Sequence, residues 1–301
     1  MIDLYNNNGG EQGLNPYETC CLASLFLPMI DSKEELIEIT KLLYRICKHS
    51  LALDAHTEQT ANIVNENFRM GISAGGILQA LDKVEWLDDC YKALREYDNQ
   101  YSDQHGFPRS IKLTTIKPDG TLSLLPGITS GVHPGYAHFM KRRIRIASEH
   151  PLVEMCRSKG YDVEFQKKFD GTLDHETAVV TFPFSYPPNT IVKDNLSALE
   201  QLKYVKLMQS VWSDNAVSCT VYFGDDELEG IKEYLKMYYR YNHKSLSFLK
   251  KSNHGFDQAP FEEITEEEYL AMTGKVEKIS KISDELDISY DDECAGHCPV
   301  R

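Results

Sequence analysis

Two residue types that can act on a substrate lie close together near the N-terminus. Glu11 precedes Cys20 by nine residues, in a polar segment rich in glycine. A carboxylate and a thiol that the fold brings together can serve as a general base and as a reductant or nucleophile. Carboxylates beside glycines usually lie in solvated loops, so this pair alone is weak evidence for a site.

A second pair of thiols, Cys294 and Cys298, lies near the C-terminus in an acidic setting. Zinc is one interpretation, but a tetrahedral site needs four ligands and this segment offers Cys294, His297 and Cys298 at most. An incidental terminal pair is another. We favour a reversible dithiol, which a flexible tail can carry to a buried disulfide and exchange with it. We therefore predict a redox tail and no metal site.

A third motif follows a predicted strand and precedes the glycine-rich turn at residues 126–131. Backbone amides and hydroxyl groups at such a turn form a cradle for an anion such as phosphate. A tight structural loop is the alternative. The candidate binding residues are Pro118, Asp119, Gly120, Thr121, Leu122 and Ser123.

The chain has eight cysteines and no secretion signal, which argues against a disulfide scaffold. Cys47, Cys90 and Cys156 stand singly among apolar or helical neighbours. A free cysteine behaves as a small hydrophobic residue, so we expect these three to be buried in the core.

The elements that must position these groups alternate between helix and strand. Ser32 and Glu35 form a capping-box pattern before apolar residues at helical spacing, which predicts a helix over residues 33–50. Helices alternating with short apolar strands predict an α/β fold with a largely parallel sheet. Further predicted helices cover 55–70, 76–97, 198–213, 227–241 and 265–272, with a turn at 71–76; predicted strands cover 111–116, 178–182, 218–223 and 245–249.

Composition limits the function. The formal net charge of −14 argues against a nucleic-acid binder, because phosphate neutralisation needs a basic surface. The sequence lacks a signal peptide and any run of 18 apolar residues, so we expect a cytoplasmic protein without a membrane span. We place a domain boundary after Phe261, between a domain over 1–261 and an acidic tail over 262–301.

Several segments, in order, resemble the ribonucleotide reductases, and in particular their monomeric, adenosylcobalamin-dependent class (class II). The similarity covers roughly residues 7–301, and the combination of several motifs in one chain is highly specific. These are Gly10-Glu11-Gln12 with Cys20 to Ala23, Arg69 to Ile72 within 62–76, residues 114–123 with 131–134 and 142–145, residues 212–218, and the Cys-Ala-Gly of the tail.

The resemblance implies roles for these residues. Glu11 would be the general base on the ribose 3′-hydroxyl, Asn7 a hydrogen-bonding partner of the substrate, and Cys20 one of two thiols oxidised as the 2′-carbon is reduced. Residues 118–123 would hold the phosphates of a ribonucleoside triphosphate. Cys294 and Cys298 would re-reduce the active-site disulfide and be recharged by a thioredoxin-like protein, while adenosylcobalamin supplies the radical in the complete enzyme.

The chain departs from this family at its first residues. Asn8 stands where the family has proline, and Gly9 where it has the cysteine that carries the thiyl radical. The chain also begins at this motif. We therefore expect the second half of a ten-stranded α/β barrel that needs the missing N-terminal half as a partner and is inactive alone.

Two alternatives remain open from the sequence. One is a fragment of a class I large subunit, which relays its radical through paired tyrosines such as Tyr238 and Tyr239; these lie in a helical pattern, where packing explains them. The other is a non-catalytic half-barrel that binds a nucleotide or a partner, which Gly9 favours.

Overall fold

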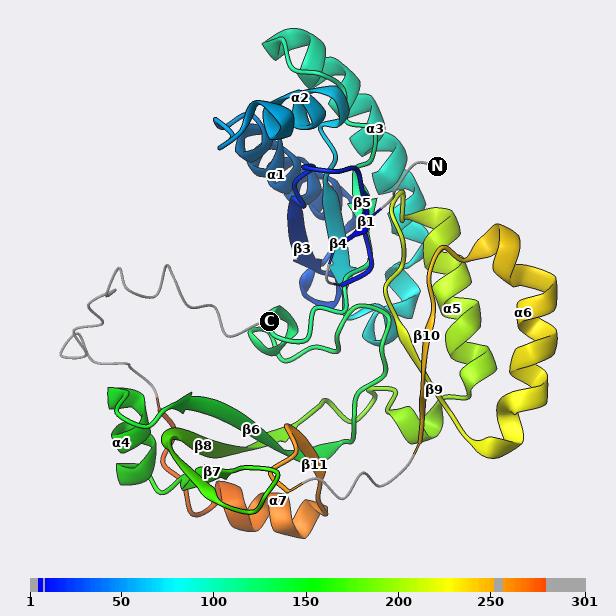
Figure 1. The fold of residues 1–301 in the computed structure, drawn as a ribbon. Helices are drawn as coiled ribbons and strands as arrows, with labels where there is room; N and C mark the ends of the chain where they lie inside the picture. Colours follow the sequence, from blue (N-terminus) through cyan, green and yellow to red (C-terminus); the bar gives the residue numbers. More distant parts are fainter. Residues whose placement is uncertain (1–4, 8, 252–256, 280–301) are drawn as a thin grey trace. The chain divides into compact units, whose positions relative to one another are not determined.

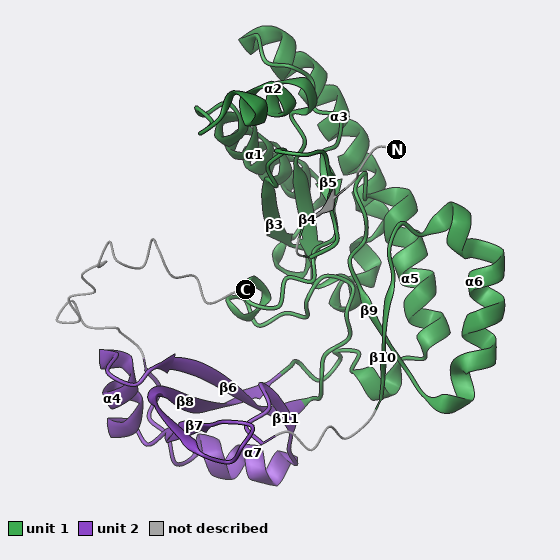
Figure 2. Ribbon diagram, in the orientation of Figure 1, with its two compact units in different colours: residues 1–138, 186–253 green, residues 139–185, 254–301 purple. Residues whose placement is uncertain are grey.

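The computed structural model describes residues 5–7, 9–251 and 257–279. The chain divides into two compact units, shown in Figure 2: unit 1 comprises 1–138 and 186–253, and unit 2 comprises 139–185 and 254–301. The predicted boundary after Phe261 falls inside unit 2, within a strand that pairs with an earlier part of the chain.

Unit 1 contains a series of parallel strands (Figure 1). Strands β3 (Leu22–Phe26), β4 (Gly71–Gly75) and β5 (Thr114–Thr115) pair in that order, and β9 (Thr220–Phe223) pairs with β10 (Ser247–Lys250). A parallel bridge between Ile116 and Val217 joins the two groups. The predicted parallel α/β arrangement is therefore confirmed for this unit.

Helices fill the connections between these strands. Helix α1 begins where predicted, because the Ser32 hydroxyl accepts a hydrogen bond from the Glu35 amide at 3.1 Å. The Glu35 carboxylate accepts from the amide of Asp31, one residue before the expected capping-box partner. The helices of unit 1 are α1 (Lys33–Leu51), α2 (Glu58–Asn67), α3 (Glu85–His105), α5 (Ala198–Val211) and α6 (Leu228–Asn242).

The turn predicted at residues 71–76 is wrong, because most of this segment is the fully buried strand β4. Its glycines reflect close packing instead of a turn: a Cβ on Gly71 would lie 2.7 Å from the Leu22 side chain. The helix predicted from residue 76 is also partly wrong. Two 3₁₀ turns, Ile77–Gln79 and Leu81–Lys83, precede α3.

Unit 2 is an antiparallel sheet in the order β11-β6-β8-β7. The strand predicted at 178–182 lies here, so it does not extend the parallel sheet. The elements are β6 (Phe139–Ala147), α4 (Pro151–Ser158), β7 (Asp162–Lys167), β8 (Leu173–Ser185), β11 (Phe261–Glu263) and α7 (Glu266–Thr273).

The core of unit 1 lies between the parallel strands and their helices. Trp212, which is almost fully buried, donates its indole N–H to the carbonyl oxygens of Ile72 and Thr115. Cys47 and Cys90 are buried in this core, and Cys156 is buried in unit 2, as predicted. In the part of the chain that the structure describes, no helix has the length and apolar character needed to cross a bilayer.

Candidate functional site

A short hairpin presents the N-terminal motif. Its strands are β1 (Tyr5–Asn6) and β2 (Gly13–Leu14), and the Asn7 amide donates to the Gln12 carbonyl at 3.0 Å. Gly10 has a φ of +72°, which favours glycine, whereas the backbone of Gly9 is not in that region. The hairpin is tied to the parallel strands because the Ala216 amide donates to the Glu11 carbonyl at 2.8 Å.

Glu18 fixes the segment between this hairpin and β3. Its Oε1 accepts from Asn67 Nδ2 at 2.9 Å and from Arg69 Nε at 2.8 Å, and its Oε2 accepts from the Asn15 amide at 2.8 Å. The Glu18 side chain is only 1% exposed. These hydrogen bonds fix the backbone just before β3 and so position Cys20.

The structure brings Asn7, Glu11 and Cys20 together. Asn7 Nδ2 donates to Cys20 Sγ at 3.2 Å, while its Oδ1 accepts from the Gln12 amide at 3.0 Å. The pKa of the Cys20 thiol is raised, first by desolvation and also by the negative charge of Glu11; the bond from Asn7 opposes the rise. Glu11 is itself buried. A base and a thiol therefore share one environment, although they lie in different segments.

The Glu11 carboxylate occupies the space that a side chain at residue 9 would need. A Cβ built on Gly9 would lie 2.0 Å from Glu11 Oε2. That oxygen is buried without a hydrogen-bond partner among the described residues. The carboxylate can therefore move away without losing a hydrogen bond from this atom.

Sequence analysis did not single out the polar and small residues on the face of the parallel strands that carries Ser24. Side chains alternate along a strand, so Ser24 and Leu25 point to opposite faces of β3, and Leu25 is buried in the core. Ser24 donates to Asp119 Oδ1 at 3.2 Å and accepts from Lys117 Nζ at 3.0 Å. The register of β3 against its neighbours creates this contact, and a single sequence does not reveal that register.

The predicted phosphate loop follows β5. Asp119 has a φ of +54°, a left-handed conformation that aspartate tolerates better than most residues. The Ser123 amide donates to the Asp119 carbonyl at 3.1 Å, whereas the amides of Gly120, Thr121 and Leu122 make no hydrogen bond to the residues that the structure describes. Free amides beside a 3₁₀ turn suit an anion.

His133 connects the chain that follows this loop to the start of β9 by hydrogen bonds. Its Nε2 accepts from the Thr220 amide at 3.0 Å, so the proton lies on Nδ1, which donates to the Ser130 carbonyl at 3.1 Å. Burial lowers the pKa of His133 and favours this neutral form. Ser130 in turn lies 3.3 Å from the Ser123 hydroxyl.

Several buried polar atoms of the N-terminal hairpin and of the loop after β5 lack hydrogen-bond partners among the described residues. They are Glu11 Oε2, Asp119 Oδ2 and both side-chain polar atoms of Gln12. Buried polar groups are normally hydrogen-bonded, so a cluster of unpaired ones indicates a place where a ligand, water or another chain supplies the partners. Sequence analysis included Gln12 in the N-terminal motif but gave it no role.

The tail cysteines, a metal centre and the tyrosine pair were also considered from the sequence, and the described residues add no site for them. Cys294, His297 and Cys298 lie outside the described residues. Within the described ranges, no three His, Cys, Asp or Glu side chains are grouped so that they would hold a metal. Tyr238 packs against Tyr234 with ring centroids 4.9 Å apart, and Tyr239 is 46% exposed, an arrangement that packing on α6 explains.

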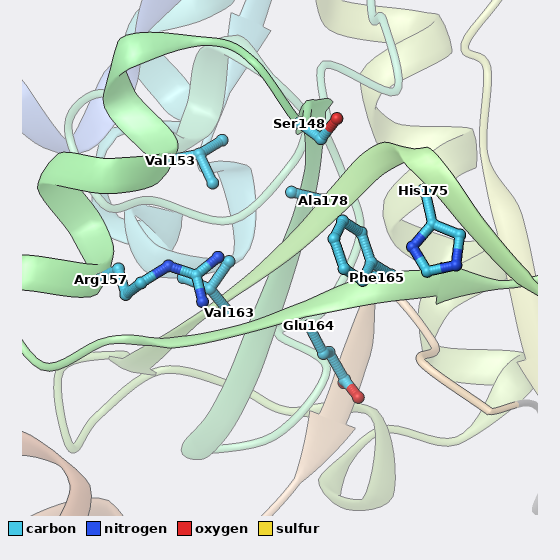
Figure 3. Close-up of a pocket in the computed structure, with 8 residues that line it drawn as sticks. All are labelled: Ser148, Val153, Arg157, Val163, Glu164, Phe165, His175 and Ala178. Atoms are coloured by element: carbon cyan, nitrogen blue, oxygen red, sulfur yellow. The ribbon is translucent and has the colours of Figure 1, made fainter.

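Unit 2 has a hollow between α4 and strands β7 and β8 (Figure 3). None of the predicted site residues lines it. Its lining residues are Ser148, Val153, Arg157, Val163, Glu164, Phe165, His175 and Ala178.

Comparison with known proteins identifies the class first. No family model matches the chain. A crystal structure of a B12-dependent (class II) ribonucleotide reductase superimposes with a TM-score of 0.79 at 29% identity, over 91% of this chain and 42% of that one. The parallel strands of unit 1 are thus consistent with part of the ribonucleotide reductase barrel, as predicted.

Curated relatives then identify the type. The chain is 34% identical to the adenosylcobalamin-dependent ribonucleoside-triphosphate reductase of Euglena gracilis, over 91% of this chain and 38% of the relative. It is 31% identical to the enzyme of the same name from Lactobacillus leichmannii, over 98% of this chain and 45% of the relative. The chain is therefore homologous to part of the adenosylcobalamin-dependent ribonucleoside-triphosphate reductases and spans less than half their length.

Proposed function

We propose that this chain supplies the base, one reducible thiol and the phosphate loop of a ribonucleoside-triphosphate reductase. The observation that carries the proposal is the grouping of Asn7, Glu11 and Cys20 in unit 1, where the carboxylate of Glu11 is buried and the thiol of Cys20 is exposed. The nucleotide would lie along the face of the parallel strands that carries Ser24, with its phosphates on residues 118–123 and its ribose at Glu11.

Each residue then has a defined task. Glu11 takes the proton of the ribose 3′-hydroxyl, and its unpaired Oε2 is the acceptor for it. Cys20 and a partner thiol lose two electrons and two protons to form a disulfide, while the 2′-carbon is reduced and its hydroxyl leaves as water. Asn7 holds the Cys20 sulfur and is positioned to contact the substrate.

Turnover requires the disulfide to be reduced again. We propose that Cys294 and Cys298 do this by thiol–disulfide exchange and are then recharged by a thioredoxin-like protein. Such exchange needs a reducing compartment, so we place the protein in the cytoplasm.

The residues present do not fit adenosylcobalamin chemistry at position 9. In the complete enzyme the cofactor supplies a radical, which the family holds on a cysteine sulfur. Gly9 has no sulfur, and the Glu11 carboxylate fills the space beside it. We therefore propose that the chain as given does not reduce nucleotides, and that adenosylcobalamin acts in a complete enzyme with cysteine at this position.

The other part of the barrel is the expected partner. Among the described residues, β3 pairs only with β4 and β10 only with β9, so each strand has one side without a strand neighbour. Unpaired strand edges favour the addition of further strands. We propose that a polypeptide equivalent to the part of the relatives that this chain does not span binds there.

A test is to mix the chain with that missing part, taken from the Euglena gracilis relative, and to follow complex formation by size-exclusion chromatography. The proposal predicts a complex of the two chains that binds CTP. Absence of CTP binding by both the complex and the free chain would contradict it.

A non-catalytic nucleotide-binding half-barrel is a second candidate, because Gly9 removes the radical-carrying group. It predicts CTP binding without turnover even after Gly9→Cys. The reductase proposal predicts turnover in that variant.

A further inference from the structure

Lys117 and Asp119 form a partly buried ion pair that lacks part of its hydrogen bonding among the described residues. Lys117 Nζ lies 3.5 Å from Asp119 Oδ1, which is long for a contact between opposite charges. Its shorter contact is to Ser24 Oγ, at 3.0 Å. The second carboxylate oxygen of Asp119 has no partner among the described residues. A buried pair is stable only when its remaining donors and acceptors are satisfied, so this one is incomplete without a ligand.

The two charges differ in accessibility. The Lys117 side chain is 16% exposed, whereas that of Asp119 is 1% exposed. Lys117 directly precedes the phosphate loop, and Asp119 belongs to it. The ammonium group is therefore the member of the pair that an incoming anion can reach.

We propose that Lys117 binds a phosphate group of the nucleotide, and that its ammonium exchanges the long contact with Asp119 for a phosphate oxygen. This inference rests on the proposed function and adds to it a charged side chain next to the loop. Ser24 is a positioning residue, because it holds the ammonium beside the loop before the nucleotide arrives, whereas the Asp119 carboxylate competes with the phosphate for that ammonium.

The chemistry of the site fits a phosphate. An ammonium group has three donors, and Lys117 directs one of them to Ser24 at 3.0 Å. The amides of Gly120, Thr121 and Leu122, which have no hydrogen-bond partner in the described part of the chain, supply further donors from the loop backbone. Because the chain carries a formal net charge of −14, a triphosphate needs such a local cluster of donors.

The position of Lys117 also suits a nucleotide that reaches from the loop to the thiol. Its positive charge lowers the pKa of Cys20, while desolvation and Glu11 raise it. Lys117 thus acts electrostatically on Cys20 and contacts the first part of the loop.

The test measures binding of inorganic tripolyphosphate and of CTP to the full chain by isothermal titration calorimetry. Asp119→Asn removes the competing carboxylate and is expected to tighten tripolyphosphate binding several-fold. The double variant Lys117→Met/Asp119→Asn differs from it only at Lys117 and leaves no unpaired buried carboxylate. It should bind about 10–100-fold more weakly than Asp119→Asn, the usual value of a hydrogen bond to a charged group.

Lys33→Met is the matched control, since it removes the same charge from an exposed pair between α1 and α3 and should leave affinity unchanged. Circular dichroism establishes that each variant is folded. Equal affinity of Asp119→Asn and the double variant would overturn the role of Lys117, and so would weaker binding by Asp119→Asn than by the unaltered chain. Lys117-dependent binding of tripolyphosphate with no binding of CTP would keep the phosphate site and refute the nucleotide function.

Discussion

Two lysine–aspartate pairs in unit 1, one fully buried and one partly buried, differ in how completely their hydrogen-bonding groups are satisfied. Lys48 donates to Asp98 Oδ1 at 2.9 Å, to the Pro108 carbonyl at 2.6 Å and to Ser110 Oγ at 3.0 Å, so all three of its donors are used. Asp98 also accepts from the Tyr44 hydroxyl and the Ser110 amide. The pair of Lys117 and Asp119 has a long contact, and Asp119 Oδ2 has no hydrogen-bond partner within residues 5–7, 9–251 and 257–279.

The difference separates a structural pair from a binding pair. Lys48 and Asp98 are fully buried and connect α1 to α3, so their network has no room or need for a ligand. Lys117 and Asp119 lie at the end of β5 beside the predicted phosphate loop. An unsatisfied buried charge is costly, and a protein that keeps one at a loop is expected to complete it with a ligand.

The largest effect is expected at the complete pair. Asp98→Ala leaves the Lys48 ammonium buried without its counter-ion and should lower the free energy of unfolding by about 3–5 kcal/mol. Urea denaturation followed by circular dichroism measures this. A loss below about 1 kcal/mol would mean that the two pairs do not differ in the way proposed.

His133 offers a smaller effect, because it is a buried neutral group whose two ring nitrogens are both satisfied. His133→Ala leaves the Thr220 amide and the Ser130 carbonyl unpaired, which should cost about 1–3 kcal/mol of unfolding free energy. Thermal unfolding at pH 8 checks the value. Unchanged stability would show that the loop does not depend on this residue.

The pH dependence of the free energy of unfolding also reports on the buried, neutral state of His133. Burial lowers the pKa of His133 in the folded state below its unfolded value of 6.5, so the unfolded chain binds the proton more tightly. The contribution is present above pH 6.5 and is lost as the pH falls below it. His243, whose pKa burial also lowers, acts in the same direction, so His133→Ala should reduce the acid-side slope without abolishing it.

The smallest effect is expected at an exposed pair. Lys33 and Asp89 lie 2.9 Å apart, but their side chains are 40% and 53% exposed. Water and salt screen such a pair, so Asp89→Asn should change the free energy of unfolding by less than about 1 kcal/mol. A change as large as that of Asp98→Ala would show that short distance alone, and not burial, sets the value of these pairs.

The sequence predicted the features that depend on local rules. The Ser32 cap and the apolar spacing after it predicted α1 closely, and several motifs in the same order along the chain led to a family that the comparisons confirm. Strand β4 was taken for a turn, because glycine and serine in a strand buried on both faces follow no alternating pattern.

The features that depend on register or on long-range pairing could not be predicted. Ser24 and Lys117 meet only because β3 and β5 lie on either side of β4. The strand at 178–182 has the same apolar composition as a parallel strand, yet its partners β6 and β7 make it antiparallel. Composition alone does not distinguish these two arrangements.

The central claim is that unit 1 holds the base and one thiol of a reductase and has glycine at the position of the radical-carrying cysteine. The direct test is deoxynucleotide formation, measured by chromatography, after the chain is combined with the missing part from the Euglena gracilis relative, adenosylcobalamin and a dithiol. The unaltered chain should form no product. Gly9→Cys should form product once the Glu11 carboxylate has moved aside, and Glu11→Gln on that background should lower the rate by about 10²–10⁴-fold. Product formation by the unaltered chain would contradict the account.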